Sequence, residues 1–129
     1  MRLLLDTHVA IHSVSAVRRL PAALLDHLLL NAGESYISSV ALWEIAIKRS
    51  IPRRDPMPFD ADTALRYFIE AGHQMLAVQP QHAVAVGTLP TLHGDPFDRL
   101  LVAQAISEDM QFVTMDRLLA DYHPNVIAF

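Results

Sequence analysis

The sequence of 129 residues contains no cysteine, few charged residues and no long apolar run. Without thiols the chain can form neither disulfides nor thiolate metal sites, a composition typical of proteins in a reducing compartment. No apolar stretch reaches the roughly 18 residues that a membrane-spanning helix needs. The apolar start is interrupted by Asp6, which argues against a signal peptide. We therefore expect a cytoplasmic protein without a membrane partner.

The composition indicates one folded domain over residues 1–129. Hydrophobic residues make up 52% and charged residues 19%, which excludes a disordered chain. The net charge of −4 argues against a broad nucleic-acid-binding surface. Four basic residues nevertheless share one short window: Lys48, Arg49, Arg53 and Arg54. This basic cluster could hold phosphate, or it could be the solvated end of a helix.

Short apolar segments alternate with helical patterns along the whole chain. Strands are expected at residues 2–5, 36–38, 76–78, 112–114 and 125–128. Helices are expected at residues 7–13, from Pro21 to about 30, and at 40–50, 60–71, 81–87 and 97–108. Such alternation predicts an α/β fold whose mostly parallel sheet is covered by helices on both faces. Prolines mark a loop at 52–58, and a second loop is expected at 89–94.

Four acidic residues, far apart in the sequence, are predicted to meet at one edge of this sheet. Asp6 follows the first strand, and Asp116 lies just beyond the fourth. Glu44 lies near the start of one predicted helix, and Asp98 lies in the first turn of another. Because open parallel sheets bind ligands at the carboxyl ends of their strands, this edge is the expected site.

Four neighbouring carboxylates repel one another, and a divalent cation would remove that conflict. Ligands that are all oxygen suit Mg²⁺ or Mn²⁺, whereas zinc would favour His or Cys. A carboxylate-bound Mg²⁺ can orient a nucleophilic water and neutralise charge on a phosphodiester. The pattern therefore predicts hydrolysis of a phosphate ester.

Each acid also has a purely structural interpretation. Asp6, Asp95 and Asp116 could cap the helices that follow them, and Pro96 suits the first helical position after Asp95. Glu44 lies four residues before Lys48, a spacing that suits an ion pair on one helix.

Two further pairs near the acids have open interpretations. Thr7 and Thr114 could hydrogen-bond the ligating carboxylates, or they could be ordinary residues at strand ends. His8 and His12 have a spacing that can bind zinc, but no third ligand follows a recognisable pattern.

Four segments together resemble the motifs of PIN domains. They are residues 3–8 (LLLDTH), 38–48 (SSVALWEIAIK), 93–105 (HGDPFDRLLVAQA) and 113–116 (VTMD). Their order and spacing match over nearly the whole chain, and the third segment is the most specific. Within PIN domains the chain resembles the VapC toxins of bacterial type II toxin–antitoxin pairs.

This resemblance implies a three-layer α/β/α domain that acts as a Mg²⁺-dependent endoribonuclease. It implies metal ligation by Asp6, Glu44, Asp98 and Asp116, with Asp95 as part of the third motif. It also implies a homodimer, silenced by a VapB-like antitoxin. Arg99 and the basic cluster are candidates to contact RNA phosphates.

The chain departs from the resemblance at two places. Residues 9–13 lack an expected aromatic pair, and residues 51–56 are unusually basic. Two other functions stay open. One is a catalytically silent binding module. The other is a phosphoryl-transfer domain with Asp6 as nucleophile, although such sites usually have a second Asp where His8 stands.

Overall fold

The computed structural model describes residues 1–54, 56–91 and 94–129. Five strands form one parallel sheet in the order β3-β2-β1-β4-β5. They are β1 (Leu3–Leu5), β2 (Ser35–Ser38), β3 (Gln74–Leu76), β4 (Gln111–Thr114) and β5 (Val126–Ala128). From β1 the chain proceeds outward through β2 to β3, and afterwards from β4 to β5 on the other side. The topological switch point, where such sheets bind ligands, therefore lies between β1 and β4.

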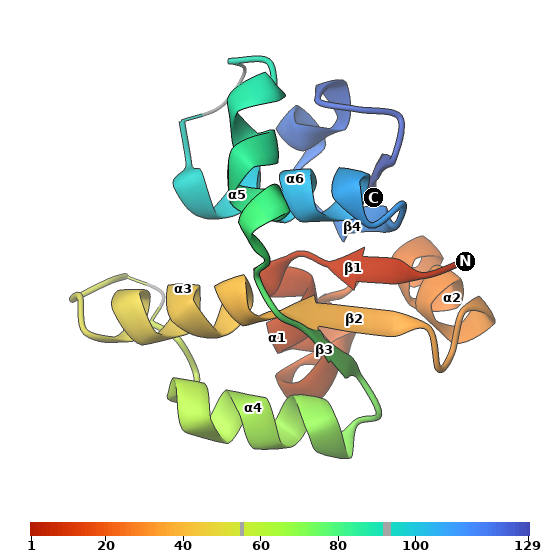
Figure 1. The fold of residues 1–129 in the computed structure, drawn as a ribbon. Helices are drawn as coiled ribbons and strands as arrows, with labels where there is room; N and C mark the ends of the chain where they lie inside the picture. Colours follow the sequence, from red (N-terminus) through yellow and green to blue (C-terminus); the bar gives the residue numbers. More distant parts are fainter. Residues whose placement is uncertain (55, 92–93) are drawn as a thin grey trace.

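Helices connect the strands and cover both faces of the sheet (Figure 1). The α-helices are α1 (Thr7–Ser15), α2 (Ala22–Leu30), α3 (Ser39–Arg49), α4 (Ala61–Glu70), α5 (Pro80–Ala85) and α6 (Pro96–Ser107). Short 3₁₀ helices are η1 (Val17–Arg19), η2 (Val86–Thr88) and η3 (Arg117–Asp121). None of the helices in the described ranges combines the length and apolar character needed to cross a bilayer.

The alternation of side chains along β1 divides the core into two parts. Leu3 and Leu5 belong to the cluster that contains α1, α2 and α4 residues such as Phe68. Leu4 points to the opposite face, where it belongs to the cluster of α6 and η3. All three leucines are fully buried, because the central strand of a parallel sheet is covered on both sides. The predicted three-layer α/β/α architecture is confirmed.

Polar residues at the ends of strands start the helices at the carboxyl edge of the sheet. Asp6 caps α1, and its side chain accepts a hydrogen bond from the backbone of Thr7. Ser38 caps α3 in the same way. Asp95 caps α6, and Pro96 occupies the first helical position. These caps satisfy backbone N–H groups that have no partner within the helix, and they bring the acidic side chains to one edge.

Most expected elements are found within one or two residues of their predicted bounds. The third strand is the one that is displaced as a whole, because it covers Gln74–Leu76 and not residues 76–78. Gly72 adopts the left-handed conformation after α4, so the chain enters the sheet at once and pairs Met75 with Ile37. The predicted loops 52–58 and 89–94 include residues 55, 92 and 93, which lie outside the described ranges.

The two-sided burial of β1 predicts a large cost for shortening Leu4. We expect Leu4→Ala to lower the free energy of unfolding by about 2–5 kcal/mol, as is typical of buried leucines. Leu30 is 84% exposed, so the same substitution there should change it by no more than about 0.5 kcal/mol. Urea unfolding of both variants tests this, and equal stability losses would contradict the packing described.

Candidate functional site

Asp6 lies at the sheet's switch point and is held by residues from both neighbouring segments. Its Oδ1 accepts the backbone N–H of Thr7 at 2.7 Å. Its Oδ2 accepts the hydroxyl of Thr114, at the end of β4, at 2.6 Å. The Thr114 hydroxyl also accepts the backbone N–H of Asp116 at 3.0 Å. The Thr114 hydroxyl thus makes the contact expected of it, and it links Asp6 to the segment that carries Asp116.

Glu44 lies beside this pair on α3 and is almost fully buried. Its Oε1 accepts the Thr7 hydroxyl at 2.7 Å. Its Oε2 contacts the Lys48 ammonium at 2.5 Å, which confirms the predicted ion pair within the helix. Thr7 therefore contacts Asp6 through its backbone and Glu44 through its side chain, so one residue fixes both acids.

Asp98 approaches the same edge from the first turn of α6. The structure shows no hydrogen bond to its carboxyl group from any described residue. Burial, and to a smaller extent the nearby charges of Asp6, Asp95 and Glu44, raise the pKa of Asp98 to about 8 against an opposing effect of Lys48. At neutral pH, without a cation, this carboxyl group is therefore mostly protonated.

The ionised form of Asp6 is also disfavoured by burial. Burial raises its pKa above the usual range, and the charge of Glu44 adds to the shift. The hydrogen bonds from Thr114 and Thr7, together with the charge of His8, oppose it. Asp6, Glu44 and Asp98 thus form a triad of mutually repelling acids, which we call the acidic triad.

Asp116 borders an open hollow next to Asp6. His8, His12 and Met115 complete the lining of this hollow. Asp116 also caps η3 by accepting the backbone N–H of Leu118 at 3.0 Å. The capping interpretation is therefore correct for Asp6, Asp95 and Asp116, and it coexists with their position at the sheet edge.

Most of the basic side chains that were candidates to contact RNA phosphates form hydrogen bonds or ion pairs within the chain. Arg99 donates to the carbonyl oxygens of Pro90 and Val86 and to the Tyr122 hydroxyl. In the basic cluster, Lys48 pairs with Glu44, and Arg49 donates to the Met57 carbonyl oxygen at 3.3 Å. Arg53 and Arg54 are exposed. RNA contact by these residues stays a prediction.

The chemistry of the acidic triad fits a divalent cation. All its donor atoms are carboxylate oxygens, which suit a hard cation such as Mg²⁺. A cation would also relieve the repulsion that raises the pKa of Asp98. Within residues 1–54, 56–91 and 94–129, no group of three or more Asp, Glu or His side chains is already arranged to hold a metal.

Comparison with known proteins identifies the family. The family model described as the PIN domain matches residues 3–123, and thus nearly the whole chain. The chain belongs to the PIN domain family. Among curated proteins, none matches the sequence.

Two solved structures share the fold of this PIN domain. The structure of VapBC2 from Rickettsia felis, bound to a DNA fragment from their promoter, matches with 21% identity and a TM-score of 0.70. The match covers 100% of this chain and 98% of the other. DNA-bound VapBC from Salmonella typhimurium matches with 18% identity and a TM-score of 0.66, covering 100% and 97%. The likeness extends over the whole domain.

The sequence interpretation overlooked the role of two histidines beside the acids. His8 and His12 face the hollow of Asp6 and Asp116 from α1. Their spacing of four residues places them on one face of the helix, directly after Asp6. The spacing is compatible with a zinc motif, but it also indicates side chains that border the acidic edge.

The raised pKa of Asp98 predicts a pH dependence of stability. Asp98 keeps its proton in the folded state above its usual pKa of 3.8, where the unfolded chain has lost it. The free energy of unfolding of the metal-free protein should therefore fall as pH rises from 3.8 towards about 8. Thermal unfolding of Asp98→Asn should show a weaker fall over this range.

Asp26→Asn is the matched control, because Asp26 is exposed on α2. It should keep the pH slope of the unmodified protein. If Asp98→Asn and Asp26→Asn retain equal slopes, Asp98 is not the group that titrates.

Proposed function

We propose that this PIN domain is a Mg²⁺-dependent endoribonuclease of the VapC type. The observation that carries the proposal is the acidic triad at the switch point of the sheet. Desolvation and mutual repulsion of these acids favour a bound cation. The match of the family model and the VapBC structures among its structural neighbours support the same assignment.

In this proposal, Asp6, Glu44 and Asp98 hold the cation, and Asp116 completes the site from the rim of the hollow. When bound, Mg²⁺ or Mn²⁺ would supply an activated water and neutralise charge on the RNA phosphodiester. Thr114 and Thr7 orient Asp6 and Glu44 through the hydrogen bonds described. Such supporting contacts matter because metal ligands function only when their own orientation is fixed.

Lys48 and Asp98 have secondary tasks at this site. Lys48 offsets part of the negative charge through its contact with Glu44. Asp98 changes between a protonated form without a cation and an ionised form that can ligate. Cation binding should therefore release a proton near neutral pH, because ligands must be deprotonated to bind.

We further propose that a VapB-like antitoxin silences the domain and that the domain forms a homodimer. Several large apolar side chains are exposed and available for such contacts. They include Trp43 and Ile47 on α3, Tyr67 and Ile69 on α4, and Leu29 and Leu30 on α2. Neighbouring pairs on one helix, such as Leu29 and Leu30, offer apolar area that a partner could cover.

The direct test is cleavage of RNA by the purified protein with Mg²⁺ or Mn²⁺. We expect Asp98→Asn to slow cleavage by about 100-fold or more, because changing even outer-shell partners of a metal typically costs 10- to 100-fold. Chelation by EDTA should stop cleavage. Induced expression in bacteria should arrest growth for the unmodified chain but not for Asp98→Asn.

Asp26→Asn again provides the control, because it removes the same charge far from the edge. It should cleave RNA and arrest growth like the unmodified chain. Cleavage that persists in EDTA, or at an equal rate in Asp98→Asn, would contradict the proposal. A folded protein that cleaves no RNA and is not stabilised by Mg²⁺ or Mn²⁺ would favour the silent module.

A further inference from the structure

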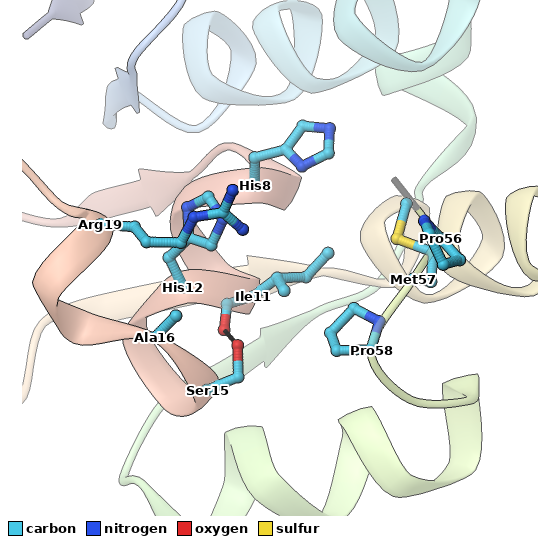
Figure 2. A pocket seen from close by; sticks show the side chains of 9 residues that line it. All are labelled: His8, Ile11, His12, Ser15, Ala16, Arg19, Pro56, Met57 and Pro58. Atoms are coloured by element: carbon cyan, nitrogen blue, oxygen red, sulfur yellow. Dashed lines mark hydrogen bonds between the residues drawn. The ribbon is translucent and has the colours of Figure 1, made fainter. Parts of the chain in front are cut away.

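A small pocket adjoins the acidic edge on the outer side of α1 (Figure 2). Figure 2 shows His8, His12 and Arg19 along one side of this pocket. Pro56, Met57 and Pro58 face them from the other side. We call this hollow the α1 pocket. One side, contributed by α1 and η1, carries two histidines and Arg19, and the other is an apolar wall contributed by the chain between α3 and α4.

The α1 pocket continues into the hollow that contains Asp6 and Asp116. His8 and His12 line both. His8 and His12 lie in the first and second turns of the helix that Asp6 caps, so the pocket begins within one helical turn of Asp6. A polymer whose reacting bond lies at the triad would therefore place its next unit at the α1 pocket.

The wall of the pocket is fixed by the core. Met57 is 5% exposed and belongs to the same core cluster as Ile11 of α1. Arg49 at the end of α3 donates to the Met57 carbonyl oxygen. The pocket therefore has a preformed apolar side, which reduces the entropy that a ligand would lose on binding.

The lining of the pocket suits the parts of one nucleotide. Its volume of about 180 Å³ is below the roughly 300–1,000 Å³ of pockets that hold drug-sized ligands, so it can enclose a base, with the phosphate outside at the exposed Arg19. The proline and methionine side chains offer flat apolar contact for a base. The Arg19 guanidinium offers the planar, paired donors that bind phosphate.

Arg19 is a better candidate for phosphate than the other cations near the triad. Lys48, Arg49 and Arg99 each contact acceptors within the chain. The Arg19 side chain is exposed and has no hydrogen bond or ion pair to any other described residue. An available guanidinium beside an acidic edge is suited to keep a negatively charged polymer in place.

We propose that the α1 pocket binds the RNA nucleotide next to the cleaved phosphodiester, with the phosphate at Arg19 and the base against Met57 and the prolines. This inference rests on the proposed ribonuclease function and adds a binding site for its substrate. A segment of a partner protein is the competing occupant. The mixed charged and apolar lining and the small volume favour a nucleotide.

The test compares Arg19→Ala with Arg18→Ala, its neighbour on η1. Both arginines are exposed, but only Arg19 lines the pocket. Binding of a single-stranded RNA of about 12 nucleotides is measured by fluorescence anisotropy in EDTA, over a range of salt concentrations. We expect Arg19→Ala to weaken binding about tenfold and to reduce the salt slope by about one, as for loss of one phosphate contact. Arg18→Ala should leave both values unchanged.

A second variant and a second readout separate this inference from the proposed function. Ala16→Leu fills the pocket without changing charge and should also weaken RNA binding. Adenosine 5′-monophosphate should shift the amide NMR signals of Ala16, Met57 and Arg19, whether or not the protein cleaves RNA.

Two results would overturn the pocket assignment. One is RNA binding that is equal in Arg19→Ala, Ala16→Leu and the unmodified chain. The other is loss of binding to a partner protein, with RNA binding intact, in both pocket variants; this would assign the pocket to the protein partner. In either case, metal-dependent cleavage of RNA would leave the ribonuclease function standing.

Discussion

The structure of the functional edge depends on the burial of one carboxylate, that of Asp6. The sheet order places Asp6 between the ends of β1 and β4, where an open sheet leaves a crevice. A buried carboxylate is tolerated only if hydrogen-bonded, and Thr7 and Thr114 provide those bonds from both sides. The same bonds start α1 and join β1 to the segment after β4. The fold and the site thus depend on the same contacts.

The acidic side chains of the site repel one another and are partly or fully buried. Glu44 has an ion pair with Lys48 and a hydrogen bond from Thr7, but Asp98 has no such partner among the described residues. Its pKa of about 8 expresses the cost of placing another negative charge at this edge. A bound cation would remove this cost, because its positive charge would allow Asp98 to stay ionised beside Asp6 and Glu44. The repulsion explains why the acids lie together without already forming a coordination shell.

Much of the fold could be predicted from the sequence, because the apolar strands and the capping residues carry local signals. The alternation of β1 and the Asp95–Pro96 start of α6 are examples. The third strand was misplaced because it is an edge strand. Its position follows from pairing with β2 and from the left-handed Gly72, whereas the apolar run 76–78 extends beyond the sheet.

The acids of the site were found from their places at strand ends and helix starts, which the topology brings together. Other features depend on tertiary contacts that no local pattern encodes. The sequence makes Arg99 a candidate to contact phosphate. In the folded chain, however, its guanidinium donates hydrogen bonds to the carbonyl oxygens of Pro90 and Val86. The α1 pocket forms only when residues 56–58 pack against α1, so its lining was not visible from the motif containing His8.

The most direct test of the account is a crystal structure with Mn²⁺ bound, located by its anomalous scattering. The account predicts a peak at the carboxyl edge, with oxygen ligands from Asp6, Asp98 and Glu44, and closer approach of these acids than in the metal-free protein. A peak ligated elsewhere, for instance by His8 and His12 without the acidic triad, would contradict it. So would a structure at saturating Mn²⁺ in which the edge holds no metal.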